Sequence, residues 1–70
     1  MKEHARLNIG IIGCGLIGAK RARNLGGHRL VAVADIHLSK AKALAGEHPE
    51  CEAFQDWKAV TNRQDIEAVI

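Results

Sequence analysis

Aromatic side chains are scarce in this 70-residue chain, which has one phenylalanine, one tryptophan and no tyrosine. Such a composition offers no platform on which nucleic-acid bases could stack. The ten lysine and arginine residues are nearly balanced by eight aspartate and glutamate residues, so no basic surface for a phosphate backbone is expected. We therefore expect no nucleic-acid partner.

Cysteine is equally scarce, because Cys14 and Cys51 are the only two in the chain. They are too few and too far apart for a disulfide framework or a zinc site, which favours a reducing compartment. Four histidines show no metal-ligand spacing and lie in expected tails or loops: His4, His28, His37 and His48. No apolar stretch reaches the length of a signal peptide or a membrane span. We expect a cytoplasmic protein with no metal site and no membrane contact.

Short apolar runs alternate with segments of helical periodicity along the chain. This order predicts an α/β fold with a Rossmann-type, doubly wound parallel sheet: a βαβαβ half with a fourth strand begun at the C-terminus. The expected strands are 7–12, 29–35, 51–54 and 66–70, and the expected helices are 16–25, 38–45 and a turn at 57–60. Because residue 70 lies inside an apolar run, we expect residues 1–70 to be the N-terminal part of a dinucleotide-binding domain, without a substrate domain.

Three glycines follow the first expected strand and open the first expected helix, in the pattern G-x-G-x-x-G: Gly13, Gly15 and Gly18. In a dinucleotide site the first glycine permits a sharp turn, the second lets the backbone approach the pyrophosphate, and the third lets the helix pack closely against the strand. The first amides of that helix have no intrahelical acceptor and lie at its positive end. We expect the N–H groups near Leu16 and Ile17 to face the pyrophosphate.

Asp35 ends the second expected strand, 17 residues after Gly18. An acid at this place accepts hydrogen bonds from the adenosine ribose and repels a 2′-phosphate. No arginine follows within the next few residues, although Lys40 is near enough to reach the site. The pattern predicts NAD rather than NADP, with Asp35 and the adjacent Ile36 among the cofactor contacts.

Other polar and apolar residues are expected to have structural roles. Cys14 is interpreted as a packing residue, and Arg21 as part of the solvated face of the first helix. Asp56 is interpreted as a helix N-cap and Trp57 as an apolar anchor. No acid–base pair with catalytic logic is present, so we expect no catalytic residue in this chain.

Four segments together resemble the glucose-fructose oxidoreductase, inositol dehydrogenase and MocA family of NAD(P)-dependent oxidoreductases. They are IGIIGCGLIG at 9–18, LVAVAD at 30–35, AKALA at 41–45 and DWKAVTNRQDIEAVI at 56–70. The resemblance spans residues 7–70. It departs from the family pattern at Arg21, where many members have histidine.

The resemblance implies an enzyme that moves a hydride between nicotinamide and a hydroxyl-bearing carbon of a sugar, a cyclitol or a related compound. It implies that the glycine motif with Leu16 and Ile17 holds the pyrophosphate and that Asp35 holds the ribose. The family's Glu-Lys-Pro motif and later catalytic residues have no counterpart before residue 70, so we expect the chain alone to be inactive. We expect the full-length protein to be a homo-oligomer. Two alternatives remain: an NAD-sensing regulatory domain without catalysis, and an FAD-binding oxidoreductase.

Overall fold

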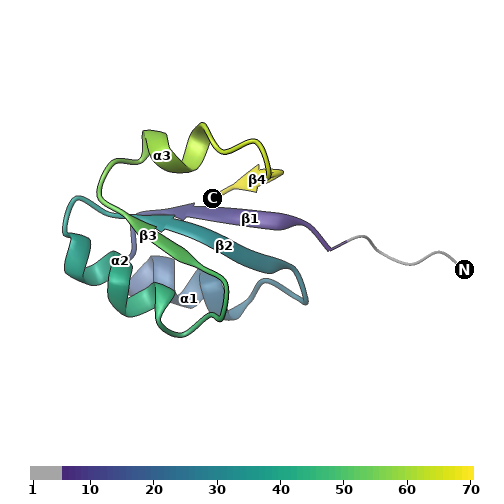
Figure 1. Cartoon of the computed structure of the whole chain (residues 1–70). Coiled ribbons are helices and arrows are strands. Elements are labelled where there is room, and N and C mark those ends of the chain that lie inside the picture. The colour runs from purple at the N-terminus through teal and green to yellow at the C-terminus, as the bar shows by residue number, and fades with distance from the viewer. Residues whose placement is uncertain (1–5) are drawn as a thin grey trace, which may run out of the picture.

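A computed structural model describes residues 6–70 as a parallel sheet with helices on both faces (Figure 1). The strands are β1 (Asn8–Ile12), β2 (Arg29–Ala34), β3 (Glu52–Phe54) and β4 (Ala68–Val69). They lie in the order β3-β2-β1-β4, and each neighbouring pair is parallel. The predicted doubly wound α/β fold is confirmed, including the fourth strand at the C-terminal end.

Helices α1 (Leu16–Arg23) and α2 (Leu38–Ala45) cover one face of the sheet, and the short helix α3 (Lys58–Thr61) lies over the other (Figure 1). The expected helix 16–25 is two residues too long. Asn24 caps α1, and its amide donates to the carbonyl of Arg21. Gly26 and Gly27 follow with positive φ angles of 62° and 94°, so the chain has left the helix before it reaches them.

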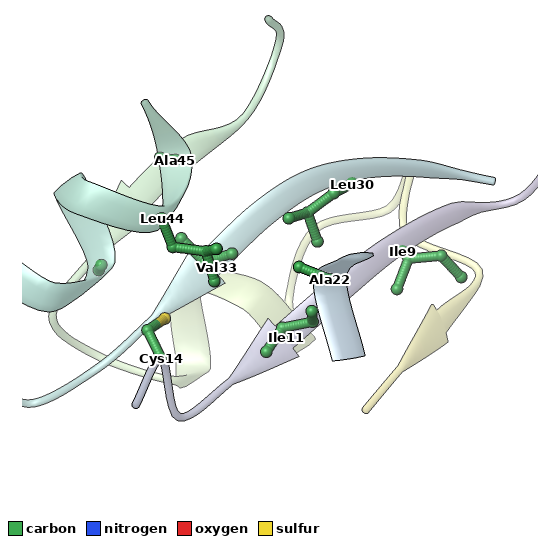
Figure 2. Packing of buried hydrophobic residues seen from close by; sticks show 9 residues of the cluster. Ile9, Ile11, Cys14, Ala22, Leu30, Val33, Leu44 and Ala45 are labelled. Atoms are coloured by element: carbon green, nitrogen blue, oxygen red, sulfur yellow. The ribbon is translucent and has the colours of Figure 1, made fainter. Parts of the chain in front are cut away.

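The larger core lies between the sheet and helices α1 and α2 (Figure 2). Ile9 and Ile11 point to this side because alternate residues of a strand share a face. Small residues, Ala22 on α1 and Ala41 on α2, let both helices approach the sheet. The other members of this buried cluster are Cys14, Leu30, Val33, Leu44 and Ala45.

The opposite face of the sheet packs against α3, where Val60 is fully buried. Gly10 of β1 faces this side, and a Cβ built on it would lie 2.5 Å from Val60 Cγ1. The register of β1 and β2 shifts here, because Ile9 pairs with Leu30 whereas Gly10 pairs with Ala32. Val31 is therefore an extra residue of β2, and its side chain joins the α3 side.

Three of the strands end level with one another. Ile12 pairs with Ala34, and Ala34 pairs with Phe54. The next residue of each strand, namely Gly13, Asp35 and Gln55, therefore lies at the same edge of the sheet. In open α/β sheets ligands bind outside this carboxyl edge, so the register gathers the expected site residues there.

Candidate functional site

The glycine loop between β1 and α1 is fastened to the end of β2 by its first two amides. Gly13 has a φ of 92°, a backbone conformation that residues with a side chain rarely adopt. Its N–H donates to the Ala34 carbonyl at 2.8 Å, and the Cys14 N–H donates to Asp35 Oδ2 at 2.8 Å. The loop thus has one fixed path across the edge of the sheet.

The backbone N–H groups at the start of α1 differ from those of Gly13 and Cys14, because they are available to a ligand. The α1 hydrogen-bond ladder begins with Ala19 N–H donating to Gly15 O at 2.9 Å, so the amides of Leu16, Ile17 and Gly18 precede it and have no intrahelical acceptor. Gly15 occupies the N-cap without a side-chain cap, and the first turn holds no acidic residue. These donors and the helix dipole make a site suited to an anion such as a pyrophosphate.

Gly15 and Gly18 are required for different reasons. A Cβ on Gly18 would collide with the carbonyl group of Gly13, whereas a Cβ on Gly15 would meet no atom within 4 Å apart from its own chain neighbours. Gly18 therefore secures the packing of α1 against the loop. Gly15 keeps open the space in which a ligand would approach the backbone.

The Asp35 carboxylate is held in place by two backbone amides. Oδ2 accepts from Cys14 N–H, and Oδ1 accepts from His37 N–H at 2.8 Å. These two bonds, from Cys14 first and then from His37, lower the pKa of Asp35 below its ordinary value. A carboxylate offers about four acceptor positions, so roughly two remain, as many as the hydroxyls of an adenosine ribose.

Cys14 is buried between the loop and the sheet, which confirms its packing role. Its Sγ lies 3.4 Å from the Ala34 carbonyl oxygen, to which the thiol donates. Burial, and then the nearby charge of Asp35, raise the pKa of the Cys14 thiol. A thiol that is buried and has a raised pKa is a poor nucleophile, in keeping with a packing role.

Two hollows flank the glycine loop. The larger, of about 630 Å³, borders the start of α1 and the end of β4, and the smaller, of about 180 Å³, borders the ends of β2 and β3. Ile12 and Gly13 line both. The remaining residues of the larger hollow are Ile11, Gly15, Leu16, Ile17, Gly18, Arg21 and Ile70, and those of the smaller are Ala34, Asp35, Ile36, Gln55 and Trp57.

All seven predicted cofactor contacts border one of these two hollows: Gly13, Gly15, Leu16, Ile17, Gly18, Asp35 and Ile36. Seven further lining residues were not predicted as site residues: Ile11, Ile12, Arg21, Ala34, Gln55, Trp57 and Ile70. Gln55 was recognisable in principle, since it directly follows a predicted strand at the carboxyl edge. Arg21 was assigned to the solvated face because the helical pattern alone does not locate a hollow beside α1.

The prediction for Trp57 is wrong. Its surface is 52% exposed, and it lines the smaller hollow rather than anchoring a core. Val60, three residues later, fills the core position on this side. The adjacent prediction is confirmed in part, because Asp56 Oδ1 accepts the Lys58 N–H at 2.9 Å, although Trp57 occupies the N-cap position itself.

Within residues 6–70, no group of three or more histidine, cysteine or acidic side chains is arranged to hold a metal ion. Of the helices in this described part, none has the length and apolar character needed to cross a membrane. His28, His37 and His48 lie outside the helices and strands, as expected, and His4 lies outside the described residues.

The sequence matches a family model over residues 7–70, which is described as an oxidoreductase family with an NAD-binding Rossmann fold. An inositol 2-dehydrogenase from Burkholderia multivorans is 38% identical over 69 residues, covering 91% of this chain and 20% of that protein. An inositol 2-dehydrogenase from Saccharopolyspora erythraea is 34% identical over 72 residues, covering 97% of this chain and 21% of that protein. The chain thus spans about a fifth of the length of these relatives.

The structure of the chain also resembles solved structures of myo-inositol dehydrogenases. A myo-inositol dehydrogenase from Lactobacillus casei, in complex with NAD(H) and myo-inositol, superposes with a TM-score of 0.84 at 28% identity, over 93% of this chain and 21% of that one. A myo-inositol dehydrogenase from Corynebacterium glutamicum superposes with a TM-score of 0.83 at 31% identity, over 93% of this chain and 20% of that one. Both carry the same arrangement of strands and helices over the matched part.

Proposed function

Because the chain belongs to the glucose-fructose oxidoreductase, inositol dehydrogenase and MocA family, an oxidoreductase family with an NAD-binding Rossmann fold, we propose that residues 1–70 are the N-terminal part of the dinucleotide-binding domain of an NAD-dependent dehydrogenase. In this proposal the amides of Leu16, Ile17 and Gly18 bind the pyrophosphate. Asp35 binds the adenosine ribose. The substrate domain lies elsewhere in the full-length protein.

The main support for this proposal is that the backbone amides of the glycine loop fall into two groups, one bonded within the protein and one available to a ligand. Those of Gly13 and Cys14 are used internally, at 2.8 Å each. Those at the start of α1 have no intrahelical acceptor. A Cβ on the adjacent Gly15 would meet no atom within 4 Å apart from its own chain neighbours. A pyrophosphate needs several backbone donors and close approach, and this loop supplies both.

The preference for NAD over NADP rests on Asp35. Its carboxylate is immobilised by two amides and its pKa is lowered, so it stays charged at neutral pH. A 2′-phosphate on the ribose would be brought against this charge. The ribose hydroxyls of NAD, in contrast, can donate to its unused acceptor positions.

For the full-length protein, we propose oxidation of a hydroxyl-bearing carbon on a cyclitol or sugar. Relatives that match over the same region are inositol 2-dehydrogenases, and the bound nicotinamide would supply the hydride acceptor. The described residues contribute cofactor binding and orientation, and the acid–base groups belong to the rest of the protein. We propose that the full-length protein is a homo-oligomer. We also propose that it lies in the cytoplasm, in keeping with the two free cysteines, because free thiols persist in a reducing compartment.

Calorimetric titration of the full-length protein with NAD, NADP and FAD, combined with an assay of NADH formation from myo-inositol and other polyols, tests the proposal. We expect NAD to bind at least about tenfold more tightly than NADP. Gly15→Val should abolish NAD binding without unfolding the protein, because the added side chain enters the ligand space and not the core. Asp35→Ala should reduce the difference in binding affinity between NAD and NADP.

Three results would contradict parts of the proposal separately. Full NAD affinity in Gly15→Val would remove the pyrophosphate assignment. Tight FAD binding in place of NAD would favour a flavoprotein. NAD binding without NADH formation from any polyol would favour an NAD-sensing regulatory domain.

A further inference from the structure

The smaller hollow adjoins the proposed ribose site at Asp35 and is lined mainly by apolar side chains. Trp57 is 52% exposed and Ile36 is 74% exposed, and both line it. Its volume of about 180 Å³ is below the range of roughly 300–1,000 Å³ typical of sites for whole drug-sized ligands. The hollow is therefore sized for one ring system rather than a complete ligand.

Asp35 forms part of the same hollow. If this carboxylate binds the adenosine ribose, the base is joined to that ribose by a single glycosidic bond and must lie in or beside the hollow. An aromatic side chain beside a base provides a stacking surface for its π-face. Trp57 is the only described aromatic side chain there, and Ile36 adds an aliphatic surface.

Gln55 gives the hollow a polar group of fixed orientation. One of the two N–H groups of its Nε2 donates to the Ile36 carbonyl at 3.1 Å, so the amide plane is held. Among the described residues no group donates to its Oε1. The amide thus offers a ligand the Oε1 acceptor beside its second N–H donor. This pair matches the 6-amino donor and an adjacent ring nitrogen of adenine, whereas hypoxanthine and guanine would place a 6-oxo acceptor against Oε1.

We propose that Trp57 and Ile36 hold the adenine ring of the cofactor and that Gln55 Oε1 accepts a hydrogen bond from its 6-amino group. This inference rests on the proposed function. It assigns base recognition to Gln55 and Trp57, two residues that follow β3 and that the glycine motif does not reveal. Their role is to position the adenosine end of the dinucleotide, since neither reaches the reacting atoms in this assignment.

Calorimetry on the full-length protein tests the inference with three probes: NAD, nicotinamide hypoxanthine dinucleotide and nicotinamide mononucleotide. Trp57→Ala should raise the Kd for NAD about tenfold, as expected for loss of one base–aromatic stack, and Trp57→Phe should restore most of it. Binding of nicotinamide mononucleotide, which has no adenine, should be unchanged in both variants. Because Trp57 is half exposed, its replacement should leave the thermal unfolding temperature nearly unchanged.

The Gln55→Leu variant isolates the hydrogen bond from the stack. The wild type should prefer NAD over the hypoxanthine dinucleotide severalfold, about the value of one net hydrogen bond, and Gln55→Leu should remove the preference. Thr61→Val is the matched control, because Thr61 is an exposed residue of the neighbouring helix α3 and does not line the hollow. It should leave all three affinities unchanged.

The two proposals fail in different ways. If Gly15→Val abolishes NAD binding while Trp57→Ala and Gln55→Leu bind NAD like the wild type, the adenine assignment is wrong and the proposed function stands. If the wild type binds no NAD, the proposed function itself is wrong. Equal loss of nicotinamide mononucleotide binding in Trp57→Ala would indicate a general disturbance of the site and would also overturn the adenine assignment.

Discussion

Single atoms decide the geometry of the glycine loop. The glycine motif predicts a separate role for each of its three glycines, and the structure shows two of these roles directly. Gly13 has the positive φ that the turn needs, and a Cβ on Gly18 would collide with the Gly13 carbonyl. The role of Gly15 stays a prediction, because it concerns a ligand. A motif can thus predict the protein's own packing more firmly than what binds to it.

Gly18→Ala should destabilise the protein. The added Cβ would collide with a backbone carbonyl, which cannot rotate away as a flexible side chain could, so the loop or α1 must move. We expect the free energy of unfolding to fall by about 2 kcal/mol, a cost in the range of overpacking, and NAD affinity to fall with it. Urea denaturation followed by circular dichroism measures the first effect.

Gly46→Ala is the matched control for this substitution. Gly46 caps α2 with a right-handed helical φ of −64°, and a Cβ there would lie 3.4 Å from the Lys42 carbonyl oxygen. This variant should be neutral, or more stable by a few tenths of a kcal/mol. If Gly18→Ala proved as stable as Gly46→Ala, the close contact between α1 and the loop would not limit stability.

Asp35 should make stability depend on pH in acid. Its pKa is lower in the folded protein than in the unfolded chain, because the carboxylate accepts amide hydrogen bonds only when folded. The unfolded state therefore binds more protons, and the stabilisation is complete above the ordinary aspartate pKa and is lost as the pH falls through the lowered one. Asp35→Asn should flatten the fall in urea midpoint between about pH 5 and about pH 3.

Asp65 also has a lowered pKa, because of its side-chain hydrogen bonds with Arg63, so some acid dependence should remain in Asp35→Asn. An Asp35→Asn profile superimposable on the wild type would show that the bonds from Cys14 and His37 do not distinguish the two charge states.

At the level of whole elements, Arg63 connects the segment between α3 and β4 to the sheet. Its Nε and Nη2 donate to the Asp65 carboxylate, at 2.9 Å and 2.6 Å, and its Nη1 donates to the Val31 carbonyl at 3.1 Å and to Glu52 at 3.0 Å. Val31 is the extra residue at the register shift of β2. Arg63 thus provides a donor for a carbonyl at an irregular point of the sheet.

Arg63→Lys should therefore cost stability even though the charge is kept. Lysine lacks the planar fork that reaches two carboxylates and a carbonyl at once, so we expect the free energy of unfolding to fall by about 1 kcal/mol. Arg23→Lys, on the exposed end of α1, is the control and should change nothing measurable. Thermal melts of both variants make the comparison, and equal melting temperatures would show that Val31 gains nothing from its arginine partner.

The elements that the sequence predicted well are those defined by local patterns. Runs such as residues 30–34 are apolar without interruption, so their identity as buried strands needs no distant information. The bulge at Val31 was not predicted, because it depends on how β2 pairs with β1. The contacts of Arg63 with Glu52 and Val31 were not predicted, because they join residues 11 and 32 positions apart. Trp57 was expected to be an apolar anchor, because apolar content does not tell whether a neighbouring element covers the side chain.

Across the whole molecule, the exposed apolar surface is concentrated at one end of the sheet. Seven large hydrophobic residues of the described part are exposed, and all but Val69 line the two hollows beside the glycine loop: Ile12, Leu16, Ile17, Ile36, Trp57 and Ile70. Scattered exposed apolar residues need no explanation, but a concentrated patch indicates a binding surface. The carboxyl edge of the sheet is thus distinguished by composition as well as by backbone geometry.

A chain of this size buries only about 60% of its unfolded surface, so ligand binding should change its stability visibly. At a concentration one hundred times its Kd, NAD should add about 2.7 kcal/mol to the free energy of unfolding, which for so small a domain raises the melting temperature by roughly 10–20 °C. AMP at the same multiple of its own Kd should add the same amount, because this stabilisation depends only on the ratio of ligand concentration to Kd. At equal concentration AMP should stabilise the chain more than nicotinamide mononucleotide does, and the reverse order in a thermal-shift assay would place recognition in the larger hollow beside Leu16 and Ile70 rather than at Asp35.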